Sequence, residues 1–248
     1  MRDADFSLAR EHTIYQLLNT PNKGYPFPHS YIENFFPKNF YDQIQTHMLD
    51  ETDLMPLSSS GLVKIGAFQE RSILQMPSER LNALKTSQQI FWNNMSELLN
   101  SIELQTALLH KFQPLVDHRL GKNLGGDTVI NSEVLFFQDK GGFSIGPHPD
   151  VNSNVVVLLI YLPQTDNNID SGTSLYAPKD RGFKCEIGCH YAVEFFDRIY
   201  TFEYRPNTAI CFLKTSTSFH GVEQIPITDD LRNLIQVSIQ HDPVTKPL

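Results

Sequence analysis

Residues 146–162 read GPHPDVNSNVVVLLIYL, in which a polar, proline-containing segment runs into eight consecutive hydrophobic residues, 155–162. A hydrophobic run of this length, bounded by Asn and Pro, is typical of a buried strand. It is far shorter than the roughly 20 residues that a membrane-spanning helix needs. The stretch therefore predicts a buried strand, with the side chains of His148 and Asp150 just before its start.

The rest of the second half of the chain also has the pattern of a β domain. Runs of about 5–8 residues rich in Val, Ile, Phe, Tyr and Thr are separated by Gly, Pro, Asn and Asp. Because no helical pattern lies between these runs, we expect a sandwich or barrel of the jelly-roll kind rather than a parallel βαβ sheet. Strands are expected at 128–138, 154–162, 173–177, 191–196, 199–204, 208–213, 218–223 and 231–240.

The first half has helical patterns instead, and a glycine-rich break at 121–126 separates the two halves. We expect one α+β domain over 1–248, mainly β with flanking helices. It would consist of a helical support and substrate-loop region at 1–127 and a jelly-roll catalytic core at 128–242. The small, polar segment 57–62 is a candidate loop near the binding site. Hydrophobic residues recur at helical spacing over 37–48, 78–99 and 102–120.

Charge and cysteine content limit the classes of function. The 248 residues include 28 Asp and Glu against 20 Lys and Arg, so the net charge is −8. An acidic surface repels the phosphate backbone, so nucleic acid is not expected as a partner. A membrane is not expected either, because the hydrophobic runs are too short to span one. Three cysteines, an odd number without framework spacing, suit a reducing compartment. No signal-like hydrophobic segment follows the first residues, so a cytoplasmic location is expected.

Two histidines and one aspartate form a candidate metal site. Side chains two residues apart on an extended segment point the same way, so His148 and Asp150 can bind one ion together. This triplet alone is weak evidence, because nine histidines and 28 carboxylates among 248 residues produce about one such triplet by chance. Its context is stronger, since His220 follows about 70 residues later and Arg232 lies 12 positions beyond it. Two imidazoles and one carboxylate on one face of an octahedron are the ligands of non-haem Fe(II) oxygenases.

Arg232 lies in the last expected strand, 231–240. Alternation places it on one face of that strand, while the opposite face is hydrophobic. A buried arginine needs a carboxylate partner, because an unpaired buried charge is costly. Its planar fork binds a carboxylate through two parallel hydrogen bonds, so Arg232 is a candidate site for a dicarboxylate cosubstrate. The hydrophobic face consists of Leu231, Ile235, Val237 and Ile239.

Taken in order, these motifs resemble those of the Fe(II)/2-oxoglutarate-dependent oxygenase superfamily, in particular its prolyl-hydroxylase-like branch. The resemblance covers about residues 128–242. It implies a double-stranded β-helix, a jelly roll of the cupin-like type, with Fe(II) as the metal, 2-oxoglutarate as the cosubstrate and O2 as the oxidant. The matching segments are Phe137-Gln138, Pro147-His148-x-Asp150, Ile160-Tyr161-Leu162-Pro163, Ser171-Gly172-Thr173-Ser174-Leu175, Phe219-His220-Gly221-Val222 and Arg232.

The resemblance implies a role for each main motif residue. His148, Asp150 and His220 match the iron ligands. Arg232 matches the residue that pairs with the distal carboxylate of 2-oxoglutarate. Tyr161 matches a second hydrogen-bond donor to that carboxylate.

Two further residues are weaker candidates. Gln138 occupies a position where relatives often have a tyrosine that contacts the cosubstrate, and a structural role is the alternative. Arg71 lies where the superfamily often builds substrate contacts, so it is a candidate clamp for a substrate carboxylate, with a surface salt bridge as the alternative. A zinc site at Cys185, Cys189 and His190 is not expected, because a structural zinc usually has four ligands at paired spacings.

The implied reaction is hydroxylation of an unactivated C–H bond, with release of succinate and CO2. The substrate class is a small metabolite, an amino-acid-like molecule or a peptide. Asp150 argues against chlorination, because relatives that halogenate lack this carboxylate. The sequence departs from the family pattern at Leu234, where some branches have a serine, and at Asn207, where a turn glycine is usual.

Several alternatives stay open at the level of the sequence. Desaturation, ring formation and epimerisation use the same ligands as hydroxylation. A metal-dependent jelly-roll enzyme that does not use 2-oxoglutarate is a different enzyme class. A jelly-roll binding module that keeps the fold without turnover is the non-enzymatic alternative.

Overall fold

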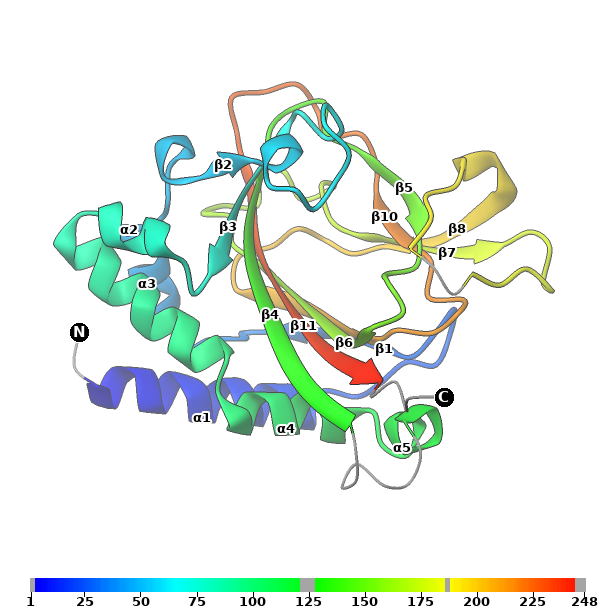
Figure 1. Cartoon of the computed structure of the whole chain (residues 1–248), viewed down its shortest axis with the longest axis horizontal. Coiled ribbons are helices and arrows are strands. Elements are labelled where there is room, and N and C mark those ends of the chain that lie inside the picture. Colours follow the sequence, from blue (N-terminus) through cyan, green and yellow to red (C-terminus); the bar gives the residue numbers. More distant parts are fainter. Residues whose placement is uncertain (1–2, 121–127, 186–187, 244–248) are drawn as a thin grey trace.

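The computed structural model describes residues 3–120, 128–185 and 188–243, which form two antiparallel sheets and a layer of helices (Figure 1). The helices are α1 (Asp3–Asn19), α2 (Lys38–Thr46), α3 (Thr86–Leu99), α4 (Ile102–Lys111) and α5 (Leu115–Leu120). Short 3-10 turns lie at Glu51–Asp53, Leu57–Ser59, Glu79–Ala83 and Val193–Phe195. The strands are β1 (His29–Glu33), β2 (Met55–Pro56), β3 (Arg71–Met76), β4 (Thr128–Asp139), β5 (Ile145–His148), β6 (Asn154–Tyr161), β7 (Ser174–Pro178), β8 (Phe196–Thr201), β9 (Thr208–Leu213), β10 (His220–Val222) and β11 (Arg232–Pro243).

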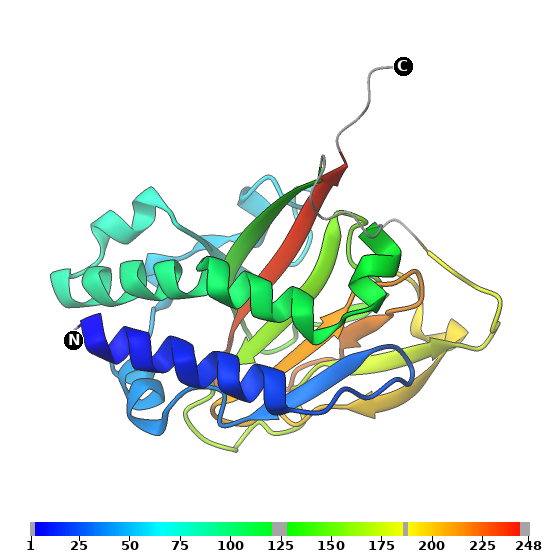
Figure 2. The ribbon, with the colours of Figure 1, turned by 90° about the horizontal axis from the view of Figure 1, so that it is seen from below.

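The sheets and helices stack in layers. The larger sheet has seven strands in the order β1-β9-β6-β11-β4-β3-β2, and the smaller has four in the order β5-β10-β7-β8. Figure 2 shows α1, α3 and α4 running along one side of the larger sheet. The other side packs against Leu175 of the smaller sheet. The expected α+β jelly-roll fold with flanking helices is confirmed.

Alternation along the strands gives the larger sheet two different faces. In β6, the even-numbered residues from 156 to 160 belong to the hydrophobic cluster that packs on the helices. The odd-numbered residues from 157 to 161 belong to the cluster that faces the smaller sheet. In β11, Ile235 faces the helices and Leu234 faces the smaller sheet. We call the face toward the smaller sheet the inner face, and Arg232 shares it with Leu234, as the alternation predicts.

Helix α3 is anchored to the larger sheet by Trp92, which is fully buried. Its ring packs edge-on against Phe136 of β4, with the ring centroids 5.5 Å apart. Its Nε1 donates a hydrogen bond to the carbonyl of His47, just after α2, at 2.7 Å. One side chain therefore joins α2, α3 and the sheet.

The expected strand 191–196 is wrong, and the expected strand 199–204 overlaps the observed strand at 199–201 only. A 3-10 turn and the single strand β8 occupy this part of the chain. After β8, the amide of Phe202 donates to the carbonyl of Thr173, just before β7, and the amide of Tyr204 donates to the carbonyl of Ile169. The other expected strands correspond to β4, β6, β7, β9, β10 and β11.

Two expected helices are interrupted. The segment 78–99 begins with a 3-10 turn and becomes α-helical only after Lys85, whose backbone is extended (φ −56°, ψ 142°). The segment 102–120 is divided into α4 and α5 around Pro114. Proline has no amide hydrogen and disfavours helical geometry in the residue before it.

None of the expected segments covers helix α1 or the strands β1, β2, β3 and β5. In α1, the buried residues Phe6, Ala9, Thr13 and Leu17 recur at spacings of three and four, a pattern that indicates a helix. Strand β3 extends the larger sheet beside β4, so the first half of the chain is not only a helical support. The expected break at 121–126 lies outside the described residues.

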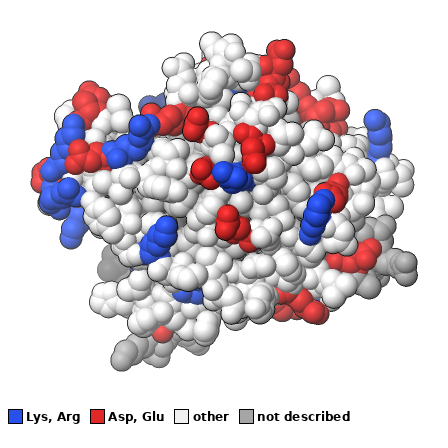
Figure 3. All heavy atoms as spheres, turned by 180° about the vertical axis from the view of Figure 1, so that it is seen from behind, with Lys and Arg blue, Asp and Glu red and all other residues white. Residues whose placement is uncertain are grey.

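The surface and the helices bear on the expected partners. On the face shown in Figure 3, Lys and Arg side chains are scattered among Asp and Glu and form no continuous basic stripe. Within the described parts of the chain, no helix is both long and hydrophobic enough to cross a membrane.

Replacing Trp92 by alanine is expected to lower the free energy of unfolding by about 3–5 kcal/mol, because it leaves a large cavity between α3 and the sheet. Denaturant unfolding followed by circular dichroism measures this change. Ile90→Ala is the control on the same helix: Ile90 is 52% exposed, so its replacement should cost less than about 1 kcal/mol. Equal losses in both variants would contradict this packing.

Candidate metal centre

The register of the smaller sheet brings the two predicted histidine ligands together. His148 is the last residue of β5 and His220 is the first of β10, and the two residues are paired across the strands. Their ring centroids are 4.5 Å apart. Asp150 follows shortly after β5, and its Oδ2 lies 3.8 Å from Nε2 of His220. Ligand atoms of the three side chains all lie within 4.8 Å of one another.

Backbone hydrogen bonds decide which imidazole nitrogen faces the cluster. Nδ1 of His148 lies 2.9 Å from the carbonyl of Gly146, and Nδ1 of His220 lies 3.0 Å from the carbonyl of Ser218. A carbonyl only accepts, so each Nδ1 carries the proton and each Nε2 keeps its lone pair. Burial lowers the pKa of His148 to about 3, helped by nearby His220, and the pKa of His220 to about 4. Both rings are therefore neutral near neutral pH, as metal ligands must be.

One oxygen of Asp150 is buried without a partner. Within the described structure, its Oδ2 has no hydrogen-bond donor. Burial raises the pKa of this carboxyl group, and the nearby His148 and Lys214 oppose the rise. An unpaired buried carboxylate oxygen is costly, and a divalent cation beside it would remove that cost. The two imidazoles and one carboxylate fit a first-row metal such as Fe(II), with coordination positions left open.

A third imidazole, that of His190, stacks on one of these side chains. Its ring centroid lies 4.5 Å from that of His148, at an interplanar angle of 15°, and 5.6 Å from that of Phe68. No role is predicted for His190 from the sequence. The position of His190 in the sequence does not indicate this contact. The fold brings His190 to His148, where the amide of Tyr191 donates a hydrogen bond to the carbonyl of Pro147.

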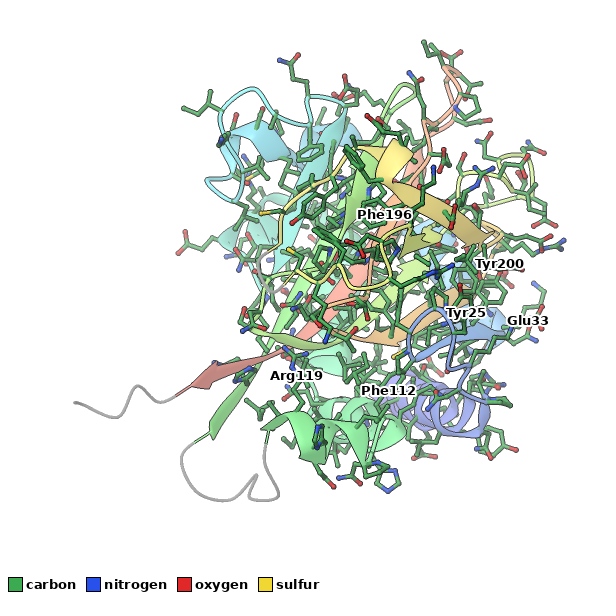
Figure 4. The ribbon with its side chains drawn as sticks, turned by 90° about the vertical axis from the view of Figure 1, so that its right-hand side faces the viewer. Tyr25, Glu33, Phe112, Arg119, Phe196 and Tyr200 are labelled. Atoms are coloured by element: carbon green, nitrogen blue, oxygen red, sulfur yellow. The ribbon has the colours of Figure 1, made fainter. Side chains whose placement is uncertain are left out.

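Helix α5 braces the loops beside the candidate ligands. Arg119, labelled in Figure 4, donates from Nη2 to the carbonyl of Asn152 at 2.8 Å and from Nη1 to the carbonyl of Lys214. Asn152 comes two residues after Asp150, and Lys214 directly follows β9. Arg119 therefore ties the loop that carries Asp150 to the end of a strand in the larger sheet.

A second polar group lies on the inner face of the larger sheet. Arg232 is buried, its Nη1 donates to Asp139 at 2.7 Å, and its Nε donates to the carbonyl of Ser171 at 2.6 Å. Its Nη2 is buried and has no hydrogen-bond partner among the described residues. Asp139 thus meets the predicted need for a carboxylate, and one guanidinium donor group is left over.

Two tyrosines flank the Arg232 guanidinium. Its central carbon lies 5.6 Å from the ring centroid of Tyr161 and 5.5 Å from that of Tyr204. The Tyr161 hydroxyl donates to Oγ1 of Thr173 at 2.8 Å and accepts from the Thr173 amide at 2.7 Å. Burial raises the pKa of Tyr161, and the charge of Arg232 partly offsets the rise. Tyr161 is therefore a neutral phenol beside the positive charge.

The two weaker candidates lie in different places. Gln138 is two residues after Phe136, which faces the helices, so both side chains lie on the same face of β4. The Gln138 side chain donates a hydrogen bond to a side chain of β11. The structure therefore does not bring Gln138 to the inner face with Arg232. Arg71 does lie on the inner face, in an ion pair with the fully buried Asp139.

Gly172 joins the residues that hold Arg232 and Tyr161, and a Cβ atom there would lie 1.7 Å from the carbonyl oxygen of Phe202. We expect Gly172→Ala to lower the free energy of unfolding by about 1–3 kcal/mol, because the backbone must shift. Denaturant unfolding measures the effect. Gly24→Ala is the control, since a Cβ there meets nothing within 4 Å. Equal stabilities of the two variants would contradict the close approach.

A scan of protein-family models and a search of curated proteins by sequence find no match to this chain. Comparison with solved structures does find similar folds. The α-ketoglutarate-dependent carbocyclase SnoK of nogalamycin biosynthesis has a TM-score of 0.52 at 10% identity, covering 97% of this chain and 84% of SnoK. The α-ketoglutarate-dependent epimerase SnoN of the same biosynthesis has a TM-score of 0.50 at 12% identity, covering 93% of this chain and 82% of SnoN.

A prolyl-4-hydroxylase from Pseudomonas putida aligns at a TM-score of 0.45 and 14% identity, over 93% of this chain and 98% of the hydroxylase. At such identities, likeness concerns the arrangement of the backbone. SnoK and SnoN have that arrangement in common with this chain. The protein therefore has the fold of these two non-haem α-ketoglutarate-dependent enzymes.

Proposed function

We propose that this protein is an Fe(II)- and 2-oxoglutarate-dependent dioxygenase that hydroxylates an unactivated C–H bond. In the proposed reaction, O2 and 2-oxoglutarate are consumed, one oxygen atom enters the substrate, and succinate and CO2 leave. One observation carries the proposal: a metal-ligand cluster and a buried arginine with a spare donor occur together where the two sheets face each other. His220 packs on Phe212 of the inner face, with ring centroids 4.7 Å apart, and Arg232 lies on that same face.

Each residue has a task in this proposal. His148, Asp150 and His220 would hold Fe(II), which when bound supplies the activation of O2 that is coupled to loss of CO2 from 2-oxoglutarate. The hydrogen bonds from each Nδ1 to a backbone carbonyl keep both imidazoles in the ligating tautomer. Arg232 would bind the distal carboxylate of 2-oxoglutarate through Nη2, and Tyr161 would line that site.

The inner-face cluster supplies the dry surroundings that the reaction requires. Its buried residues come from both sheets and include Phe137, Leu159 and Leu175. Excluding water strengthens the ion pair between a guanidinium and a carboxylate. It also protects reactive species from side reactions.

The substrate is proposed to be a small metabolite, an amino-acid-like molecule or a peptide. The structures that share the fold include a carbocyclase and an epimerase, so the fold alone leaves the outcome open. Hydroxylation is proposed as the default outcome of this chemistry, and Asp150 argues against chlorination only, because halogenating relatives lack this carboxylate. The net charge of −8 supports a partner other than nucleic acid.

Anaerobic titration tests the proposal without knowledge of the substrate. Fe(II) and then 2-oxoglutarate are added to metal-free protein while the visible charge-transfer band of a chelated complex is recorded. The band is expected in the wild-type protein. Metal binding without a band or any 2-oxoglutarate affinity would instead support a metal-dependent enzyme of another kind. Absence of Fe(II) binding would support a non-catalytic binding module.

Replacing His148 by alanine is expected to weaken Fe(II) binding by more than about 100-fold, because even the loss of an outer hydrogen-bond partner costs about 10–100-fold in metal affinity. Asp150→Ala should have a similar effect. His190→Ala is the matched control: it removes an imidazole stacked on His148 that is not part of the ligand cluster, so Fe(II) affinity should be kept. Full Fe(II) affinity in His148→Ala would remove the ligand assignment.

Replacing Arg232 by alanine is expected to weaken 2-oxoglutarate binding by at least about 30-fold, because truncating one partner of a buried charge pair costs about 2–5 kcal/mol. Fe(II) affinity should stay unchanged. Calorimetric titration of the Fe(II)-loaded protein under anaerobic conditions measures both. Arg198→Ala, which removes an exposed arginine from β8, is the control. Unchanged 2-oxoglutarate affinity in Arg232→Ala would assign the distal carboxylate to another residue.

A further inference from the structure

Three charged residues lie side by side across three neighbouring strands of the larger sheet. Arg71 on β3 is in register with Asp139 on β4, and Asp139 is in register with Arg232 on β11. The alternation of side chains along each strand places all three residues on the inner face, to which Phe137 and Leu234 also belong. Two arginines therefore flank one carboxylate on the face where the proposed cosubstrate binds.

The Asp139 carboxylate is shared between the two guanidinium groups. Arg71 donates from Nε to Oδ1 at 2.5 Å and from Nη2 to Oδ2 at 2.9 Å. Arg232 donates from Nη1 to the same Oδ2 at 2.7 Å. The side chain of Asp139 has no exposed surface, and those of Arg71 and Arg232 are 12% and 2% exposed. Little water is available to screen these three charges, so they must balance one another.

The charge count shows what Arg71 contributes. Arg232 and Asp139 alone would form a neutral pair, and Asp139 would repel an incoming carboxylate. Arg71 adds a second positive charge, so two cations and one anion leave a net charge of +1. The cluster can then attract one carboxylate group although it already contains one.

Asp139 and Ser171 together fix the plane of the Arg232 guanidinium. Asp139 accepts from Nη1, and the Ser171 carbonyl accepts from Nε. Nη2 is the remaining nitrogen of the guanidinium, and it is buried without a hydrogen-bond partner among the described residues. A buried donor without an acceptor is costly, so this geometry is suited to a ligand that accepts from Nη2.

Arg71 is itself held firmly in place. Its guanidinium carbon lies 4.4 Å from the ring centroid of Phe137 and 4.0 Å from that of Phe143. These distances are within the range of cation–π contacts. Two of its nitrogens already donate to Asp139. Arg71 is therefore oriented toward Asp139.

We propose that Arg71 is a positioning residue for cosubstrate binding: it neutralises Asp139, so that Asp139 can orient Arg232 without cancelling its charge. This inference rests on the proposed function, and it replaces the expectation that Arg71 clamps the substrate. It also gives the first half of the chain, through β3, a direct part in cosubstrate affinity.

Two variants, one that removes the net charge of the cluster and one that restores it, test the inference, with 2-oxoglutarate as the probe and Fe(II)-loaded protein under anaerobic conditions. Arg71→Gln makes the cluster neutral and should weaken 2-oxoglutarate binding by at least about tenfold. Combining Arg71→Gln with Asp139→Asn restores the net charge of +1, so the double variant should recover to within about threefold of the wild-type affinity. Fe(II) affinity should be unchanged throughout.

A purely structural role of Arg71 and Asp139 predicts a different result. If Arg71 and Asp139 only stabilise the sheet, the double variant should bind 2-oxoglutarate no better than Arg71→Gln. That result, or wild-type affinity in Arg71→Gln, would overturn the inference while leaving the proposed function intact. Absence of 2-oxoglutarate binding in the wild-type protein would overturn both.

Two further variants complete the design. Lys140→Gln is the matched charge control, because Lys140 adjoins Asp139 in the chain but its side chain is 45% exposed; 2-oxoglutarate affinity should not change. Arg71→Lys keeps the charge and should bind within about threefold of the wild type. If Arg71→Gln does not fold, Arg71→Lys and the double variant still decide, since weak binding in both folded proteins would overturn the inference.

Discussion

Every strand of the larger sheet carries two different sets of side chains, because successive residues of an extended chain point to opposite faces. The helices cover one set, and the smaller sheet covers the other. In β4, this alternation sends Phe136 toward Trp92 and the helices, and it sends Phe137 and Asp139 to the inner face. A shift of one residue in register would exchange these sets, so the alternation controls both the core and the candidate site.

Two groups of buried polar side chains lie on the inner side, and their charges are compensated in different ways. At the candidate metal centre, the imidazoles of His148 and His220 are neutral, and a carboxylate oxygen of Asp150 has no hydrogen-bond partner among the residues that the structure describes. On the larger sheet, one carboxylate is shared between two arginines, and one guanidinium donor is left over. A cation would complete the first group and an anion the second, which is why the two groups together support a metal and a dicarboxylate.

Much of the second half of the fold could be predicted from local sequence. The hydrophobic run 155–162 and the β-rich runs around it indicate strands without knowledge of their neighbours. The first half was less readable. Interruptions such as Pro114 have a local cause, whereas β3 pairs with β4 far along the chain. Beyond β8, the amides of Phe202 and Tyr204 donate to carbonyls within 169–173. The residues next to β8 in the sequence do not indicate these contacts.

The sequence by itself determined the alternating faces, the closeness of His148 to Asp150, and the need of Arg232 for a carboxylate, because these depend on residues close together in the sequence and on the cost of burying a charge. Only the tertiary structure decided that Asp139 is that carboxylate and that Arg71 shares it. It also decided that His190 stacks on His148, one of the candidate metal ligands. These contacts depend on strand order and register across the sheet and on loop packing, which bring together residues far apart in the chain.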